Sequence, residues 1–286
     1  MMAGRSRKRK VSKKRKIKRL LRLLIRLTFV ALILVTAIVL LFKLIRKDSD
    51  NTGHETKSKV SENVLDESMF KDSDETIPYE GEYEQSLKKL LKRNPEIKDY
   101  VKNFNKYSGI DFKINLKKEA SSNEVPLLMQ WDKRWGYNLY AGEPFGISGC
   151  GPTCLSMVCL YILGDEKYSP KYIGEFAEEN GYSEDKSGSY WSLISEGGEK
   201  LGLDVVEITN DEQRIINNLN ADNPIICVVG PGDFTDNGHF IVMTKYVDGK
   251  IKINDPFNKS NSEKLWDYDD IQSQLRGIWV CRKKGA

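Results

Sequence analysis

The apolar residues follow different spacings in different segments, and each spacing predicts its own structure. Residues 27–42 form a run of sixteen uncharged, mostly apolar residues. As a helix this run covers about 24 Å at about 1.5 Å per residue, and the hydrocarbon core of a bilayer is about 30 Å thick. Flanking basic side chains can extend along the apolar zone and make up the difference. We therefore expect a single transmembrane helix over residues 27–45. The following Lys43-Leu-Ile-Arg46 is not a small-x-small cleavage site, which favours an uncleaved anchor over a signal peptide.

The next two segments differ in composition and in the spacing of their apolar residues. Residues 46–78 are rich in Asp, Glu, Ser, Lys and Thr and poor in apolar side chains. They cannot bury enough surface to offset their ordering entropy, which predicts a flexible stalk. Residues 79–120 carry helical spacing interrupted at Asn94-Pro95, so we expect two short helices in a membrane-proximal segment. Within it, the alternation over residues 110–116 predicts a strand.

Residues 121–286 have the texture of a folded domain. Helical spacing predicts helices over residues 152–163, 170–180, 190–201 and 212–219, and apolar or alternating runs predict strands over residues 203–208, 225–229, 240–246 and 250–254. Helices that precede a set of strands indicate an α+β domain, with helices packed on a sheet.

Charge is divided unevenly along the chain. Residues 1–47 hold 16 basic residues and no acidic one, so the remainder has a net charge of −12 although the whole chain is at +4. Basic flanks stay in the cytoplasm, so residues 1–26 are the predicted cytoplasmic tail and the C-terminal domain faces outward, as an extracellular domain on the cell membrane. An acidic domain also argues against binding of nucleic acid, because phosphate affinity comes from clustered Lys and Arg.

The chain has five cysteines, and one of them stands in a distinctive context. Cys150 lies between two glycines and two residues before Pro152 in S-G-C-G-P-T, which places it at or just before a helix N-terminus. Unpaired amides and the helix dipole at that position lower a thiol pKa and favour a nucleophilic thiolate. An odd number of cysteines leaves at least one free thiol. The other four, Cys154, Cys159, Cys227 and Cys281, are interpreted as small buried hydrophobes whose disulfide state stays open.

A nucleophilic cysteine needs a base and an orienting acid. His54 lies in the predicted stalk, so the folded domain has only His239 to offer, at the start of an apolar strand. Asp255 follows the next strand. A two-residue turn between these strands would place Asp255 opposite Val242, away from the histidine, whereas a three-residue loop with a bulge at Gly249 would bring it to the same face as His239. Asp255 is expected at a strand end outside the core, where its replacement by Asn should change thermal stability little.

Three segments, Val125–Asp132, Gly149–Thr153 and Gly238–Val242 with Asn254–Pro256, together carry a resemblance over about residues 121–286. They resemble the papain-like cysteine peptidases of the bacteriocin-processing, C-39-like family, here in a membrane-anchored form. The resemblance implies a papain-like α+β domain and a catalytic set of Cys150, His239 and Asp255, with Gln130 as the oxyanion donor. Gln130 lies twenty residues before Cys150, a longer gap than in the transporter-linked members.

The implied reaction is acyl transfer from a peptide or protein, cell-wall peptide included, without a metal or organic cofactor. The leading hypothesis is a membrane-anchored extracellular cysteine peptidase. Two alternatives stay open. A transglutaminase-like acyltransferase uses the same order of Cys, His and Asp, and a catalytically silent binding domain would keep the fold alone.

Overall fold

The computed structural model describes residues 81–285, and all of them belong to one compact unit. The predicted cytoplasmic tail, transmembrane helix and stalk lie outside these residues and stay predictions. Within residues 81–285, no helix has both the length and the apolar character needed to cross a bilayer.

The N-terminal helices of the described unit break at Asn94-Pro95, as the sequence predicts, and again at Asn103, where no break was predicted. Helix α2 (Glu84–Arg93) ends before Asn94, and a 3-10 turn (Pro95–Ile97), α3 (Lys98–Lys102) and α4 (Phe104–Tyr107) follow. Asn94 caps the second group, because its Oδ1 accepts a hydrogen bond from the backbone N of Glu96 at 3.0 Å. The apolar faces form a cluster with Tyr137 and Phe257, so these helices pack on the domain that follows them.

The predicted strand at residues 110–116 is wrong. This segment has no strand partner and leads as an extended chain into α5 (Lys117–Ala120). The alternation that suggested a strand is nevertheless real in burial, since Phe112, Ile114 and Leu116 face inward while their neighbours are exposed. An alternation of apolar and polar residues indicates which side chains are buried, but it does not require that the backbone pairs with another strand.

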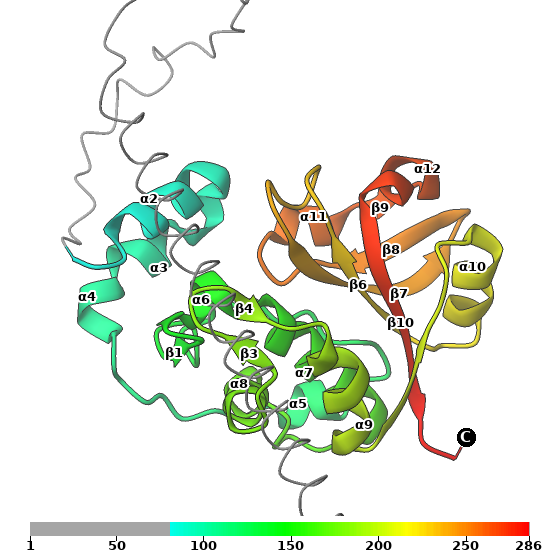
Figure 1. Ribbon diagram of the computed structural model, residues 1–286, viewed down its shortest axis with the longest axis horizontal. Coiled ribbons are helices and arrows are strands. Elements are labelled where there is room, and N and C mark those ends of the chain that lie inside the picture. Colours follow the sequence, from blue (N-terminus) through cyan, green and yellow to red (C-terminus); the bar gives the residue numbers. More distant parts are fainter. Residues whose placement is uncertain (1–80, 286) are drawn as a thin grey trace, which may run out of the picture. The chain divides into compact units, whose positions relative to one another are not determined.

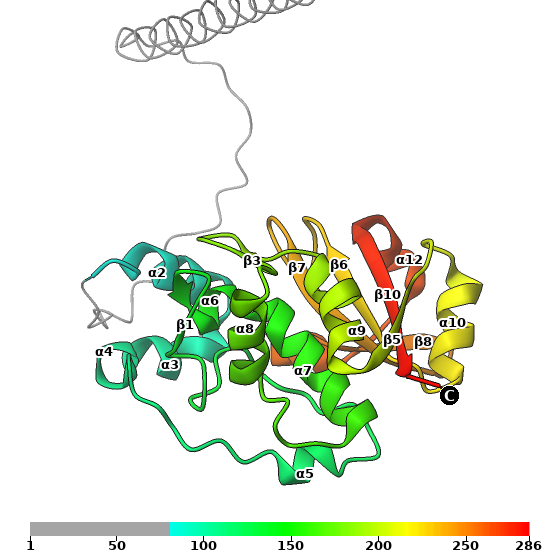
Figure 2. The same cartoon turned by 60° about the horizontal axis from the view of Figure 1, so that its bottom comes forward.

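A buried helix forms the centre of the helical half. Helix α7 (Cys150–Leu163) is buried from residue 151 to residue 160, on its whole circumference, and Gly164 ends it in a left-handed conformation. Its neighbours are α6 (Phe145–Ser148), α8 (Pro170–Glu179), a π-helical turn (Leu193–Gly197) and α9 (Gly198–Leu201). Figures 1 and 2 show α7 between α8 and the sheet.

The other half is a six-stranded antiparallel sheet in the order β5-β10-β6-β7-β8-β9. The strands are β5 (Leu203–Glu207), β6 (Ile225–Val229), β7 (His239–Val247), β8 (Lys250–Asn254), β9 (Leu265–Trp266) and β10 (Leu275–Lys283). Helices α10 (Glu212–Asn220), α11 (Lys259–Glu263) and α12 (Tyr268–Ile271) lie between strands in sequence, and two short hairpins, β1 (Leu139–Tyr140) with β2 (Glu143–Pro144) and β3 (Ser183–Glu184) with β4 (Gly188–Ser189), precede the sheet. The α+β fold with helices against an antiparallel sheet is confirmed.

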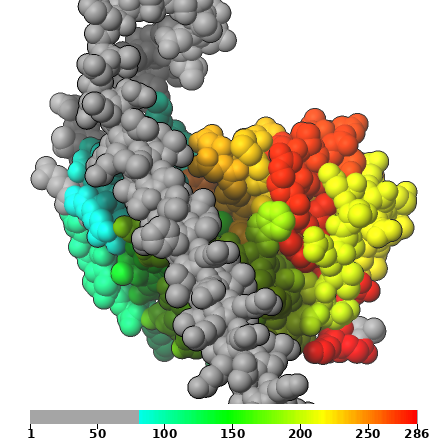
Figure 3. Space-filling model, in the orientation of Figure 1, coloured from blue at the N-terminus to red at the C-terminus, as the bar shows by residue number. Residues whose placement is uncertain are grey.

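Both faces of the sheet are buried. Phe240 and Val242 of β7 join the cluster that contains α7, whereas Ile241 and Met243 face the cluster that contains α10. Figure 3 shows the helical half, coloured cyan to green, and the sheet half, coloured yellow to red, on opposite sides of the described unit. The start of β7 therefore lies where the two halves meet, and this is where the predicted site residues gather.

Candidate active site

Cys150 is the first residue of α7, which begins two residues before the predicted start at Pro152. Its side chain is partly exposed and is not in a disulfide. The flanking glycines serve close packing, because a Cβ at Gly149 would clash with the ring of Phe145 and one at Gly151 would lie 2.5 Å from Oγ of Ser189. The chain can therefore start the helix against its neighbours and present the thiol at the helix N-terminus.

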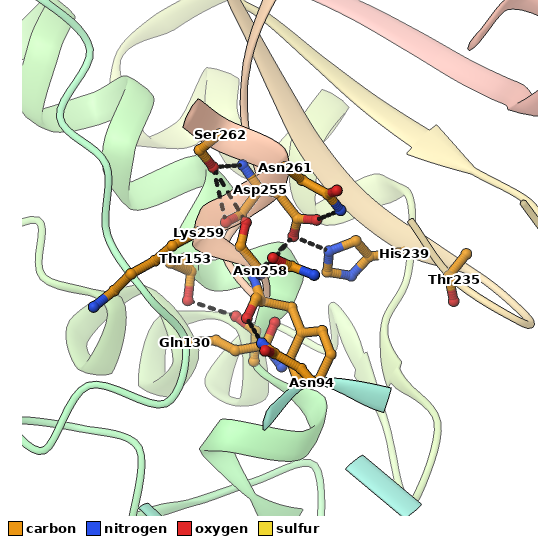
Figure 4. A network of polar contacts seen from close by, with 12 residues as sticks. Asn94, Gln130, Thr153, Thr235, His239, Asp255, Asn258, Lys259, Asn261 and Ser262 are labelled. Carbon is orange, nitrogen blue, oxygen red and sulfur yellow. Dashed lines mark hydrogen bonds and ion pairs between the residues drawn. The ribbon is translucent and has the colours of Figure 1, made fainter. Parts of the chain in front are cut away.

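The structure brings His239 and Asp255 into direct contact. Nε2 of His239, the first residue of β7, lies 2.8 Å from Oδ1 of Asp255. Both side chains are enclosed, with exposures of 8% and 0%. Because Nε2 is occupied by the carboxylate, Nδ1 is the ring nitrogen that remains for Cys150. Figure 4 shows the imidazole and the carboxylate of this pair facing one another.

The register that unites this pair arises differently from the sequence prediction. The turn between β7 and β8 contains two residues, Asp248 and Gly249, both with positive φ, as a type I′ turn requires. The extra residue is Thr244, which is left unpaired between Met243 and Lys245 in a β-bulge. Of the two alternatives, the two-residue turn is the one that forms, but the bulge shifts the register by the single residue that a three-residue loop would have supplied and pairs Asn254 with Val242. Asp255, one residue later, falls on the face of His239.

Asp255 is held by donors that sequence reasoning did not identify. Its Oδ1 also accepts hydrogen bonds from the backbone N of Phe257 at 2.8 Å and of Asn258 at 3.3 Å, and its Oδ2 accepts one from Nδ2 of Asn261 at 2.8 Å. Ser262 Oγ accepts a hydrogen bond from the backbone N of Asp255 at 2.9 Å. Asp-Pro is a turn signal that indicates the backbone bonds, but no spacing rule points to the side chain of Asn261. The expectation that Asp255 lies outside the core is wrong, since the residue is fully buried.

The three groups shift one another's ionisation in a consistent direction. Burial disfavours the Cys150 thiolate, but the hydrogen bond and charge of His239 outweigh burial and lower the pKa of the thiol. Burial likewise disfavours the imidazolium, yet Asp255 and Cys150 raise the pKa of His239 above its ordinary value. For Asp255 burial is again outweighed, chiefly by His239, and the pKa of the carboxyl is lowered. The arrangement therefore favours a thiolate–imidazolium pair backed by a carboxylate.

Comparison with known proteins identifies the family of the chain. The sequence model of the Peptidase_C39 like family matches residues 122–286. The chain belongs to this family. Two solved structures are similar to it. One is the peptidase domain of Streptococcus ComA, a bi-functional ABC transporter involved in a quorum sensing pathway, with 21% identity, a TM-score of 0.42 and coverage of 56% of this chain and 99% of that domain. The other is a C39-like peptidase from Bacillus anthracis, with 18% identity, a TM-score of 0.34 and coverage of 61% of this chain and 100% of that protein. No curated protein matches the chain significantly.

Family membership confirms the resemblance carried by the three sequence segments. A peptidase family with this α+β fold points to chemistry of the cysteine peptidase type and to peptide or protein substrates. The helix α2 and its successors up to residue 121 lie outside the matched region.

Gln130, placed in the site by resemblance, lies in the same cavity wall as Cys150 and His239. It is almost fully buried, and its backbone N donates to the carbonyl of Pro256 at 2.8 Å, next to Asp255. Its side-chain Nε2 lies 2.9 Å from the carbonyl of Gly146 and 3.2 Å from that of Ile147, while its Oε1 has no partner. The amide is therefore at the site, but in this structure it donates to the main chain.

The remaining cysteines are buried free thiols in the core, which agrees with their interpretation as small hydrophobes. Burial raises the pKa of Cys154, Cys159 and Cys227, and it raises the pKa of Cys281 to about 12. Only the thiol of Cys150 is thus favoured as a thiolate among the cysteines. Across residues 81–285, the His, Cys, Asp and Glu side chains form no group suited to hold a metal ion.

A cavity of about 470 Å³ opens at the candidate active site. One side is formed by Gln130, Cys150 and His239, and another by the residues that precede His239, from Phe234 to Gly238. A peptide carbonyl entering this cavity could reach the thiol and the imidazole together.

Proposed function

We propose that the chain is a membrane-anchored cysteine peptidase that hydrolyses peptide or amide bonds through Cys150, His239 and Asp255. The observation that carries the proposal is the 2.8 Å contact between His239 and Asp255 beside a cysteine at the N-terminus of α7. The lowered thiol pKa and the raised imidazole pKa are the shifts that a cysteine nucleophile paired with a histidine requires.

In the proposed reaction, the Cys150 thiolate attacks the substrate carbonyl carbon. The C–N bond then breaks as His239 gives its proton to the leaving amine, which leaves a thioester on Cys150. Neutral His239 next takes a proton from water, the resulting hydroxide attacks the thioester, and the acid product leaves as the thiolate returns. Asp255 fixes the ring orientation and stabilises the imidazolium in both steps.

The oxyanion of each tetrahedral intermediate needs donors, which typically contribute about 2.7–4 kcal/mol each. The Gln130 amide and the Cys150 backbone N–H are the proposed donors. Nε2 of Gln130 would exchange its longer, 3.2 Å contact with Ile147 for the oxyanion and keep the 2.9 Å bond to Gly146 as its anchor.

The proposed location is the outer face of the cell membrane. It follows from the uncharged run at residues 27–42 and the basic residues that precede it. Protease added to intact cells should degrade the chain from about residue 48 onward and spare the basic tail. Protection of residues 81–286 from external protease would contradict this orientation.

Substrate profiling tests the function directly. Purified wild-type chain and Cys150→Ala are incubated with the same proteome-derived peptide mixture, and new termini are identified by mass spectrometry. We expect cleavages that appear only with the wild-type chain. Products joined to an added amine, in preference to water, would indicate acyltransfer. If Cys150 reacts with an alkylating probe no faster than Cys281, and the wild-type chain cleaves no peptide, the domain is catalytically silent.

A further inference from the structure

Helix α2 forms a wall of the active-site cavity although it lies outside the region that matches the family. Four of its residues, Ser86, Lys89, Leu90 and Arg93, line the same cavity as Cys150 and His239. Their spacing of three and four residues puts them on one face of the helix. A substrate that reaches the thiol can therefore contact a surface that lies outside the family-matched region.

This wall is fixed to the loops that carry the catalytic residues. Nδ2 of Asn94, directly after α2, donates to the carbonyl of Phe257 at 2.6 Å, two residues after Asp255. Nη1 of Arg93 lies 2.8 Å from Oδ2 of Asp236 in the loop before His239. Figure 4 includes Asn94 with the residues of the Asp255 network. The helix thus has a defined position relative to the reacting groups, as a specificity element needs.

The charges of the cavity wall do not cancel. Arg93 forms an ion pair with Asp236. The positive charge of Lys186 favours the ionised form of the Glu143 carboxyl. Lys89 makes no ion pair within residues 81–285. Arg93 is the more covered partner of its pair, with 26% exposure against 68% for Asp236. A guanidinium has five N–H donors, so one contact with Asp236 leaves others for a second carboxylate.

We propose that α2 forms a cationic subsite of the substrate cleft, in which Lys89 and Arg93 bind an acidic side chain of the peptide near the scissile bond. This inference rests on the proposed peptidase function and names a substrate class for it. Arg93 holds the geometry through Asp236, and Lys89 supplies the unpaired charge.

The test compares Lys89→Glu with Lys92→Glu in the full chain. Both substitutions reverse one charge on an exposed residue of the same helix, but Lys92 does not line the cavity. The probes are octapeptide pools in which one position at a time is fixed as Asp, Asn or Lys. Binding is measured by fluorescence anisotropy in the Cys150→Ala background, and kcat/KM is measured with Cys150 intact.

In the parent we expect one position at which Asp pools bind about two- to five-fold more tightly than Asn pools, as for an ion pair with an exposed lysine. Lys89→Glu should abolish or reverse this preference, and Lys92→Glu should preserve it. The preference should also shrink as salt is raised from 0.05 to about 0.5 M. An Arg93→Gln variant should weaken Asp binding in the same direction.

If the ratio of Asp-pool to Asn-pool affinity is the same in the parent and in Lys89→Glu, the proposed subsite is wrong. It is also wrong if Lys92→Glu lowers this ratio as much as Lys89→Glu does. The two hypotheses fail separately. An absence of Cys150-dependent cleavage refutes the peptidase function, and the binding assay still tests whether α2 binds acidic peptides. Cleavage without a preference for acidic peptides refutes the subsite alone.

Discussion

The replacement of Asp255 by Asn tests how the site is built, because it removes one charge and changes almost no volume. The carboxylate accepts four hydrogen bonds, from His239, Phe257, Asn258 and Asn261. An asparagine amide offers an oxygen on one side only. If its oxygen faces His239 and the backbone donors, its NH₂ group meets the amide of Asn261, which must turn over to present an oxygen.

The magnitudes follow from these contacts. Hydrogen bonds to a charged group contribute about 1.5–3 kcal/mol and neutral ones about 1 kcal/mol, so the four weakened bonds together would cost about 2–8 kcal/mol. The neutral amide also avoids the penalty of several kcal/mol for burying a carboxylate, so the net loss should be about 1–2 kcal/mol even if Asn261 turns over. For a unit of this size that corresponds to a fall in Tm of roughly 2–8 °C. This replaces the sequence-based expectation of little change. Turnover should fall by about 10²- to 10⁴-fold, because the imidazolium loses its counter-charge and the ring its preferred tautomer.

The assay measures kcat/KM on a cleaved peptide, thermal unfolding, and the pH dependence of Cys150 alkylation. Asp255→Asn should move the alkylation midpoint to higher pH, since a less stable imidazolium stabilises the thiolate less. Asp248→Asn is the matched control, because Asp248 is exposed, lies in the same hairpin and has a positive φ that Asn tolerates. A kcat/KM within ten-fold of wild type with an unchanged alkylation profile would show that Asp255 does not orient His239.

Three further outcomes are expected. Cys150 should react with iodoacetamide at lower pH than an ordinary cysteine thiol, because its pKa is lowered and the thiolate persists at lower pH. His239→Ala should move the alkylation midpoint upward, and an unmoved midpoint would exclude the ion pair. Cys150→Ser should reduce turnover more than about 100-fold with an unchanged Tm, whereas Cys154→Ser should lower the Tm and spare turnover, because its buried hydroxyl costs about 1–3 kcal/mol without a partner. Asn261→Ala should lower both Tm and turnover by leaving Oδ2 of Asp255 unpaired, and unchanged values by calorimetry and peptide cleavage would exclude that support.

The elements that depend on local pattern could be predicted from the sequence. Strand β8 matches its predicted bounds, Lys250–Asn254, and α8 differs by one residue at its end. Glycine and proline around Cys150 also located the start of α7 to within two residues, since the helix begins at Cys150 and the predicted start was Pro152. In these segments the local preference and the tertiary environment agree, so neither has to override the other.

Elements defined by distant partners could not be predicted in this way. Strand β10 (Leu275–Lys283) was missed, although it lies between β5 and β6 in the sheet. Its bulge near Gly277 interrupts its pattern, and its pairing depends on segments about fifty to eighty residues earlier in the chain. The role of α2 in the cavity wall was equally hidden, because helical spacing shows that a face is covered but not which cavity the rest of the helix borders.

The contact between His239 and Asp255 depends on a feature of the fold that the sequence pattern does not determine. Residue types and order identify both groups, but whether they meet depends on a single residue of register, since a shift of one residue moves a side chain to the other face of a sheet. The Asp248-Gly249 turn is the type that this dipeptide favours, and by itself it would place Asp255 opposite Val242, away from the imidazole. The bulge at Thr244 supplies the missing residue. Threonine carries no local bulge signal, so the sequence alone does not predict the bulge. The observed register is stabilised by the burial of Asp255 and by its hydrogen-bond donors. These contacts form only after both strands and the segment after β8 have come together.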